Sequence, residues 1–330
     1  MSETRQQVRT LTVREDEDGQ RLDRYLKKHI GRTPFALVQK IIRTGQVRVD
    51  GKRAKMDTRI YVGQQVRIPP VEDKHGPVTF KKLPGDADLL KSMIVFDDGD
   101  LMVMNKPYGL ATQGGSKITR HVDGLLELMT DRKGVRPKLV HRLDRDTSGL
   151  LIAARKLATV QKMGKIFQGR EIRKYYWAVT VGVPEPREGA VVMPLGKGTG
   201  SMKDTMVHDA EFGKYAKTEF SVLETAGNSA AFVAFWPRTG RTHQIRAHAT
   251  YGLETPLLGD EKYNGMTKEF DDLGVATRLH LHAWRIICPN PNGKGFLDLK
   301  APLPQDLKAT FKAFGFHADP KADPFVDIDL

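Results

Sequence analysis

The segment from Lys138 to Ala154, KLVHRLDRDTSGLLIAA, places seven polar residues within eight positions between two apolar runs. Leu139 and Val140 predict the end of a buried strand, and residues 149–154 predict the start of the next one. A polar loop held between two core strands can aim its side chains rigidly. We therefore expect the chemistry of this chain to lie in the loop, with a sheet built around it.

Asp144 is the informative residue of this loop, because cationic or potentially cationic side chains surround it in sequence. A carboxylate among arginines keeps a low pKa and stays ionised, which suits a nucleophile or a base better than an acid. The residues alone leave a second interpretation open. Ion-pair networks also have structural uses, so the loop could merely pin two strands together.

The ten residues 141–150, HRLDRDTSGL, resemble the signature of the RluA family of pseudouridine synthases. In that family the aspartate at the position of Asp144 attacks the target uridine. The arginine at the position of Arg142 helps to hold the base out of its helix. The resemblance therefore implies that Asp144 is catalytic and that Arg142 and His141 contact the substrate.

Two further segments resemble motifs of the same family. Residues 105–110, NKPYGL, resemble its short first motif and make Lys106 a candidate RNA contact. Residues 174–178 fit a Lys-x-Tyr-x-Ala pattern, which implies that Tyr176 stacks on the uracil. Tyr175 and Tyr176 must point to opposite faces of a strand, so only one of them can face the cleft.

The segment 238–248, RTGRTHQIRAH, resembles the third family motif. The resemblance implies a salt bridge between Arg246 and the catalytic Asp144, and it makes Arg241 a candidate phosphate contact. The motif is expected to open a helix that presents Thr242 and Arg246 on one face, because residues four apart are neighbours on a helix.

The 330 residues carry 53 Lys and Arg against 40 Asp and Glu, a net charge of +13. Such a charge favours phosphate-rich partners, whose binding weakens steeply with salt. Cys288 is the only cysteine, so no intramolecular disulfide is possible and a reducing compartment fits. No apolar run of about 18 residues or signal peptide is visible. We expect a cytoplasmic protein that does not enter a membrane.

Residues 19–70 hold 13 of the basic residues and three acidic ones, and so most of the net charge. Apolar stripes at Leu22, Leu26 and Ile30 and at residues 37, 38, 41 and 42 predict two helices, followed by a small sheet. This pattern resembles the S4-like RNA-binding domain, named after a ribosomal protein. A basic helical hairpin that packs on a larger domain is the alternative. The candidate RNA contacts are Arg21, Arg24, Lys40, Arg43 and Arg48.

The expected organisation is an N-terminal arm (1–18), an S4-like domain (19–70), a linker (71–88), a catalytic domain (89–315) and a loose acidic tail (316–330). The resemblance implies an α+β fold class: a catalytic domain with a mixed, largely antiparallel sheet and a small N-terminal S4-like α/β domain. Expected catalytic-domain elements include a helix over 157–167, a strand over 172–183 and a hairpin of strands over 216–224 and 230–236.

Four histidines, His243, His248, His280 and His282, invite a zinc interpretation. His243 and His248 are five residues apart, which turns them away from each other on a helix, and no third and fourth ligands are evident. We expect no metal. The implied reaction is an isomerisation, so no cofactor is expected either.

The implied function is the conversion of specific uridines to pseudouridine in RNA. Within the family the chain most resembles the RluC type, which acts on large-subunit (23S) ribosomal RNA. The expected partner is therefore 23S RNA or a large-subunit assembly intermediate, and we expect a monomer. The alternatives are a synthase of the same family that acts on other RNA, a non-catalytic RNA-binding or ribosome-assembly protein, and a glycosidic hydrolase that uses Asp144 and Asp146.

Overall fold

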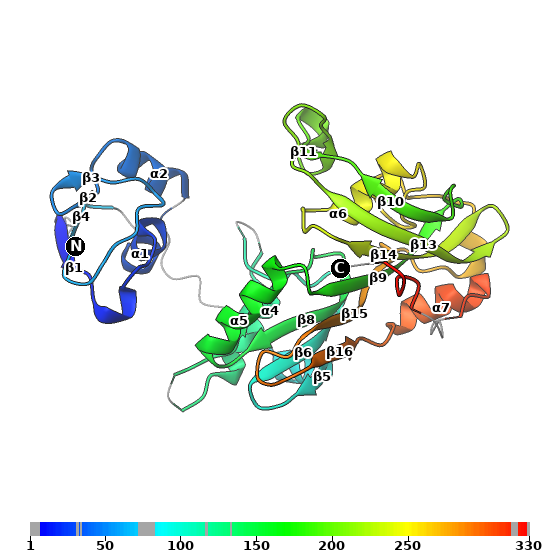
Figure 1. Cartoon of the computed structure of the whole chain (residues 1–330), viewed down its shortest axis with the longest axis horizontal. Coiled ribbons are helices and arrows are strands. Elements are labelled where there is room, and N and C mark those ends of the chain that lie inside the picture. Colours follow the sequence, from blue (N-terminus) through cyan, green and yellow to red (C-terminus); the bar gives the residue numbers. More distant parts are fainter. Residues whose placement is uncertain are drawn as a thin grey trace. The chain divides into compact units, whose positions relative to one another are not determined.

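The computed structural model describes residues 7–30, 33, 35–71, 83–115, 118–132, 134–317 and 323–328. The chain divides into two compact units, Met1–Lys81 and Lys82–Leu330 (Figure 1). Most of the segment expected as a linker, and parts of the expected arm and tail, lie outside the described residues. Each unit is described by itself.

The first unit packs two short helices against a four-stranded antiparallel sheet in the order β1-β4-β2-β3. The apolar stripe of the first helix is buried as expected. In the second helix Leu37 is 37% exposed while residues 38, 41 and 42 are buried, so the stripe is narrower than predicted. The stretch expected as an arm contributes strand β1. The elements are β1 (Arg9–Thr12), α1 (Leu22–His29), α2 (Phe35–Arg43), β2 (Arg48–Val49), β3 (Lys52–Arg53) and β4 (Gln65–Ile68).

The second unit is built on a ten-stranded sheet in the order β10-β13-β14-β9-β15-β8-β6-β5, with β16 on β15 and β7 on β8. Every strand pair is antiparallel except β15 with β8. The expected mixed, largely antiparallel sheet is thus confirmed. Its strands are β5 (Ile94–Asp97), β6 (Leu101–Lys106), β7 (Lys138–Leu139), β8 (Ser148–Ala154), β9 (Arg173–Val181), β10 (Glu188–Val192), β13 (Lys217–Ala226), β14 (Ala230–Pro237), β15 (Leu281–Pro289) and β16 (Phe296–Lys300).

Helices and a small ribbon accompany this sheet (Figure 1). They are α3 (Asp86–Met93), α4 (Val122–Leu125), α5 (Leu157–Gln168), α6 (Gln244–Ala247) and α7 (Gln305–Phe314), with the ribbon of β11 (Leu195–Lys197) and β12 (Met206–His208). The third-motif helix begins later than expected: α6 starts at Gln244 and is followed directly by a π-helical segment (His248–Gly252), so Thr242 precedes the helix.

The period of two along β9 separates the two faces of the sheet. Tyr175 and Trp177 belong to one core, which also contains Phe311 of α7. Ala178 belongs to the other core, with Ile245 of α6. Tyr176 packs against that second core. The two tyrosines therefore lie on opposite sides, as their alternation predicts.

The C-terminal tail packs on the first of these cores. Phe325 is 1% exposed and its ring centroid lies 5.2 Å from that of Tyr175. Asp323 accepts a hydrogen bond from Arg285 at 3.2 Å. The expectation of a loose tail is therefore wrong for residues 323–328, because aromatic burial and an ion pair outweigh the acidic composition.

Strands β8 and β15 meet at Gly149, directly after the polar loop. Gly149 has φ +111°, and a Cβ there would collide with the backbone of Ala283. Glycine at this position therefore permits the parallel pairing of Ser148 with His282. The loop before it emerges from the central part of the sheet.

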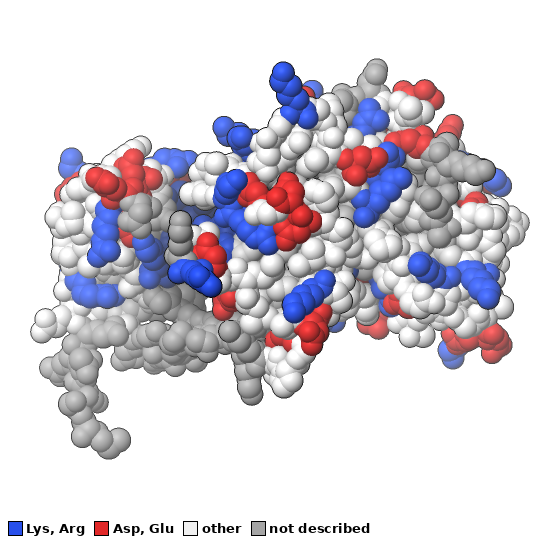
Figure 2. Space-filling model, turned by 90° about the horizontal axis from the view of Figure 1, so that it is seen from below, with Lys and Arg blue, Asp and Glu red and all other residues white. Residues whose placement is uncertain are grey.

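No helix in the described part of the chain is long and apolar enough to cross a membrane. Among the described residues on the face drawn in Figure 2, lysine and arginine side chains are interspersed with acidic ones, and no continuous field of one sign covers it.

Candidate active site

A cavity of about 310 Å³ lies where three distant segments of the second unit meet. The polar loop between β7 and β8 forms one wall, β9 forms another, and the segment from the end of β14 to α6 forms the third. The cavity brings together six of the residues expected from the separate motifs: His141, Arg142, Asp144, Tyr176, Arg241 and Arg246.

Asp144 is half-buried in this cavity, and its carboxylate has no hydrogen-bond or ionic partner among the described residues. The backbone beside it is fixed. The Thr112 hydroxyl donates to the Leu143 carbonyl at 2.6 Å, and the Leu143 N–H donates back to that hydroxyl at 3.2 Å. The carboxylate is thus held in place yet free to meet a substrate atom, as a nucleophile requires.

Asp146 has a different environment from Asp144. Its carboxylate accepts a hydrogen bond from Arg145 Nε at 3.1 Å, and it is not among the described residues that line the cavity. Hydrolysis by paired carboxylates needs both groups to flank one bond. The pair of Asp144 and Asp146 does not provide that arrangement.

Lys106 was expected to contact RNA, and the structure corrects this. Its side chain is fully buried, and Nζ donates to the carbonyl oxygens of Pro107 at 3.0 Å, Leu110 at 2.8 Å and Arg145 at 3.0 Å. Burial lowers the pKa of Lys106 to about 7. The first-motif lysine therefore ties the loop after β6 to the loop of Asp144 and is closed to an external phosphate.

Arg246 lines the cavity, but its salt bridge differs from the one that the resemblance implied. Its Nε donates to Asp260 Oδ2 at 2.7 Å and its Nη2 to Asp260 Oδ1 at 2.6 Å. Both side chains are almost completely buried. The partner of Arg246 in this structure is thus Asp260 rather than Asp144, and the pair is bidentate.

Tyr176 presents its ring to the cavity while Tyr175 is buried in the opposite core. Burial, and to a lesser extent the Asp144 carboxylate, raises the pKa of Tyr176, so its hydroxyl stays protonated. A neutral aromatic ring beside a carboxylate can stack on a flat base.

His141 supports the loop from inside. Its Nε2 accepts a hydrogen bond from the backbone N–H of Ile152 at 3.0 Å, and its ring stacks on Phe167 of α5, with centroids 4.4 Å apart. Burial lowers the pKa of His141 to about 3, so the ring is neutral. His141, which was expected to contact the substrate, therefore lines the cavity and also holds the loop against α5 and β8.

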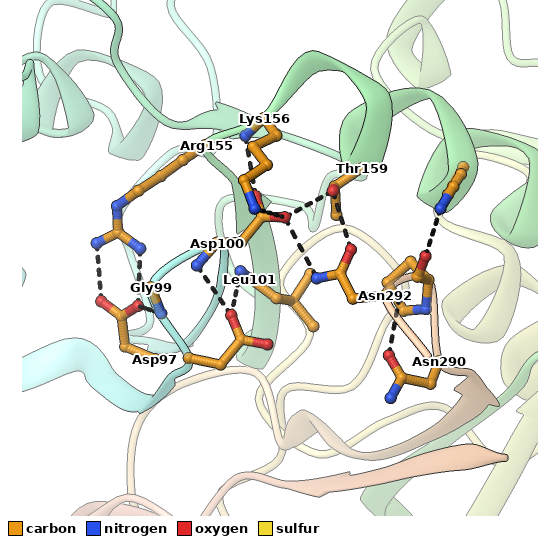
Figure 3. Close-up of polar contacts among 12 residues, drawn as sticks. Asp97, Gly99, Asp100, Leu101, Arg155, Lys156, Thr159, Asn290 and Asn292 are labelled. Carbon is orange, nitrogen blue, oxygen red and sulfur yellow. Dashed lines mark hydrogen bonds and ion pairs between the residues drawn. The ribbon is translucent and has the colours of Figure 1, made fainter. Parts of the chain in front are cut away.

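A polar network fixes the beginning of α5 (Figure 3). The carboxylate of Asp100 accepts hydrogen bonds from the Lys156 N–H at 2.9 Å and the Thr159 hydroxyl at 2.7 Å. Asn292, from the hairpin after β15, donates to the same carboxylate at 3.2 Å. The network connects the β5–β6 turn, α5 and the β15–β16 hairpin.

Arg142 and Arg241 are exposed and line the cavity. Among the described residues the Arg142 side chain has no partner, whereas Arg241 Nε donates to the carbonyl of Tyr215 at 3.0 Å. Cations so placed can meet the phosphates or bases of a nucleic acid.

Sequence reasoning gave no role in the site to three residues that line this cavity or contact its polar loop; His243 was considered only as a metal ligand and Lys174 only as part of a motif. Lys174 lines it without an ionic partner among the described residues, although it belongs to a motif that was noticed. His243 lines it from a left-handed backbone. Arg278 is buried and donates from Nη2 to the Ser148 hydroxyl at 2.8 Å. Arg278 lies 130 positions from Ser148, and no local pattern reveals such a contact.

Two of the five expected RNA contacts of the first unit have internal partners. Arg21 donates to both carboxylate oxygens of Asp23 at 3.1 and 2.8 Å. Arg48 donates to the carbonyl of Gly51 at 3.2 Å. Arg24 is exposed. Lys40 and Arg43 instead line a second cavity, of about 650 Å³, together with Gln39, Ile42, Arg53, Ala54, Lys55 and Met56.

The described residues contain no cluster of three or more His, Cys, Asp or Glu side chains suited to a metal ion. His280 and His282 use both ring nitrogens in hydrogen bonds, His282 with the Ser148 hydroxyl and the Ala301 carbonyl. Burial lowers the pKa of each of these two histidines to about 4. Neither ring has a free lone pair for a metal.

Comparison with known proteins agrees with this geometry. A family model described as RNA pseudouridylate synthase matches residues 100–251. A Pasteurella multocida protein named ribosomal large subunit pseudouridine synthase C is 37% identical over 92% of this chain and 93% of its own length. The Escherichia coli protein of that name is 33% identical over 91% and 95%.

Solved structures give the same result. The human RNA pseudouridylate synthase domain containing 4 superposes with a TM-score of 0.58 at 29% identity, over 70% of this chain and 97% of that one. The human RNA pseudouridylate synthase domain containing 1 gives 0.51 at 25% identity, over 69% and 96%. The chain belongs to the RNA pseudouridylate synthase family, whose members form pseudouridine in RNA. Within that family it is of the RluC type, the C type of its curated relatives.

Proposed function

We propose that this protein converts specific uridines of large-subunit (23S) ribosomal RNA to pseudouridine, with Asp144 as the nucleophile. The single observation that carries the role of Asp144 is that its carboxylate, in a cavity shared with Tyr176 and Arg246, has no partner among the residues that the structure describes. The relatives that support the target match more than nine-tenths of this chain and are named for the large ribosomal subunit.

The reaction is an isomerisation in which atoms and electrons balance. The bond from uracil N1 to ribose C1′ breaks and a bond from C5 to C1′ forms, while C5 loses a proton and N1 gains one. Asp144 attacks during the first stage and assists loss of the C5 proton in the last. Nothing is oxidised or reduced, and no cofactor is needed.

The target uridine must leave its helix before it can reach the cavity. Extrusion of a base costs a few kcal/mol, which contacts in the protein must offset. We assign the exposed Arg142 to filling the gap in the helix and the Tyr176 ring to stacking on the extruded uracil. Both residues line the one cavity, and its volume of about 310 Å³ suits a single base.

Arg246 has an electrostatic role in this proposal. It is held by Asp260 rather than by the nucleophile, so its positive charge is fixed in the cavity wall before substrate arrives. A preorganised charge of this kind stabilises the negative charge that develops on the reacting groups. We assign Arg241 to a contact with a phosphate of the RNA.

The first unit serves in this proposal as an S4-like RNA-binding domain, anchored through exposed cations. Lys40 and Arg43 are its best candidates, because they line one cavity together with Arg53 and Lys55. Arg24 is a further contact, while Arg21 and Arg48 contribute less because of their internal partners. We further propose that the protein acts in the cytoplasm as a monomer, on free RNA or on a large-subunit assembly intermediate.

A pseudouridine map of ribosomal RNA from cells that lack the protein tests the target. Specific large-subunit sites should disappear, and wild type should restore them while Asp144→Asn should not. Persistence of every site in the deletion would refute the ribosomal target. If pseudouridine were lost only from other RNA, the protein would be a synthase of the same family with a different target.

A further inference from the structure

His243 occupies a strained position in the wall of the catalytic cavity. Its φ of +50° and ψ of 22° place a side-chain-bearing residue in the left-handed region. Such strain persists only where the surroundings impose it, and it concentrates at functional sites. The imposed conformation therefore makes the imidazole of His243 a candidate functional group.

The neighbour Gln244 imposes this conformation. Its Oε1 accepts from the Thr239 hydroxyl at 2.7 Å and from the Arg241 N–H at 3.0 Å. Its Nε2 donates to the Lys217 carbonyl and the Thr218 hydroxyl, both at 2.9 Å. The buried amide thus ties the chain on the N-terminal side of His243 to strand β13, and α6 fixes the chain on the other side.

Tyr263 determines which nitrogen of His243 carries the proton. The Tyr263 hydroxyl accepts from the Met206 N–H at 2.7 Å and lies 3.0 Å from His243 Nδ1. Tyr263 is 1% exposed, so its hydroxyl hydrogen needs an acceptor, and in the described part of the chain Nδ1 is the one that the hydroxyl contacts. His243 Nδ1 therefore accepts, and the proton of the neutral ring is on Nε2.

The charged groups around His243 agree with a neutral ring. Asp144 and Asp260 attract a second proton, whereas Arg246 and Lys262 repel it, and burial, the largest effect, lowers the pKa of His243. A second proton on Nδ1 would also deprive the Tyr263 hydroxyl of its acceptor. The cavity that Asp144 lines therefore also contains a neutral N–H donor.

We propose that His243 is a substrate-contacting residue that donates its Nε2–H to a carbonyl oxygen of the uracil, and that Tyr263 is the positioning residue that aims it. When the bond between N1 and C1′ breaks with its electron pair on the base, negative charge spreads over the uracil ring and its oxygens. A neutral donor stabilises that charge while the base turns and does not discharge Asp144. This inference rests on the pseudouridine synthase reaction.

Single-turnover kinetics on an RNA that the wild type modifies test the proposal. His243→Ala should lower the rate constant about a hundredfold to a thousandfold, the usual effect of removing one such donor, with RNA affinity unchanged. His243→Gln keeps an amide N–H near the position of Nε2 and should recover part of the rate. His208→Ala, an exposed histidine of β12, is the matched control and should behave as wild type.

Thio-substituted targets identify the acceptor. Sulfur accepts hydrogen bonds weakly, so either 2-thiouridine or 4-thiouridine at the target should reduce the His243→Ala defect, because the deleted partner is already missing. A rate for His243→Ala within twofold of wild type would overturn the proposal. A loss of RNA affinity at unchanged rate, which a phosphate contact predicts, would also overturn it. So would a His243→Ala defect that is as large with both thio bases as with uridine.

The tautomer can be measured without a variant that might fold poorly. Long-range nitrogen–proton NMR of the wild type should give His243 a protonated Nε2 and a bare Nδ1. Tyr263→Phe should remove this preference and lower the rate less than His243→Ala does. A proton on Nδ1 in the wild type would refute the inference, whereas absence of pseudouridine with wild type would instead refute the activity on which it rests.

Discussion

The Lys106 ammonium lies 3.0 Å from the carbonyl oxygen of Arg145, and so connects the first motif to the residue next to Asp144. The same nitrogen donates to the carbonyls of Pro107 and Leu110. A single buried side chain therefore sets the distance between two loops that belong to different strands. The geometry of Asp144 depends on this contact although Lys106 does not line the cavity.

Lys106→Met should lower the rate of pseudouridine formation about a hundredfold, because a displacement of about 1 Å in a catalytic group has that effect. RNA affinity should change little, since Lys106 is closed to solvent. Single-turnover rates and filter binding separate the two quantities. Lys165→Met, on the exposed side of α5, is the matched control. A loss of affinity at full rate would restore Lys106 as an RNA contact.

Asp260→Asn should weaken catalysis by releasing Arg246. The amide offers one acceptor oxygen where the carboxylate offers two, so the bidentate pair is lost and a buried cation remains without its counter-charge. Removing one partner of a buried pair destabilises proteins by about 3–5 kcal/mol. We expect a lower midpoint of urea unfolding and a rate reduced at least tenfold in the folded variant. Unchanged stability would show that the Asp260 pair contributes nothing to the fold.

The buried histidines predict a loss of stability in acid. His248, His280 and His282 have folded-state pKa values lowered to about 4, against 6.5 for the ordinary side chain. The unfolded chain therefore binds protons before the folded one does. Their contribution is fully present above pH 6.5 and falls as the pH drops toward 4, by about 1.4 kcal/mol per pH unit for each histidine.

Tryptophan fluorescence can follow this loss in the second unit, because Trp177, Trp236 and Trp284 all belong to its core. Urea titrations between pH 7 and pH 4.5 should give a free energy of unfolding that decreases steadily. His280→Gln should reduce the slope of the free energy of unfolding against pH by the equivalent of about one bound proton. A free energy independent of pH over this range would mean that these rings bind protons as readily in the folded protein as in the unfolded chain.

Residues of the first unit should govern RNA affinity rather than the chemical step. Lys40→Glu with Arg43→Glu should weaken RNA binding at least tenfold and reduce its salt dependence, while the single-turnover rate at saturating RNA stays unchanged. Lys91→Glu with Lys165→Glu, at exposed residues of α3 and α5, is the control with the same change of net charge. Equal weakening by both variants would indicate a general charge effect and no specific surface.

The family resemblance predicted the sheet class and six of the residues that line the cavity, because the motifs that carry the resemblance are local properties of the sequence. Period two separates Tyr175 from Tyr176, and the structure then decides which of them faces the cavity. The role of Lys106 could not be predicted in this way. Its partner at Arg145 lies 39 positions away, and only the pairing of β6 with β8 brings the two loops together.

The partner of Arg246 and the packing of the tail likewise could not be predicted from local sequence. Asp260 comes from a loop without regular structure 14 residues after Arg246, and a family motif does not specify its geometry. The aspartates of the tail suggest a solvated end. The aromatic contacts of Phe325 decide otherwise, and they exist only after β9 and β14 have formed the surface that receives it.

The most direct test of the central claim is tritium release from RNA labelled at uracil C5, followed by nucleoside analysis of the product. Wild type should release one tritium for each pseudouridine formed, with no free uracil. Asp144→Asn should bind the same RNA and release none. Turnover by Asp144→Asn at the wild-type rate, or free uracil as the product of the wild type, would contradict the assignment of Asp144 as the nucleophile of an isomerase.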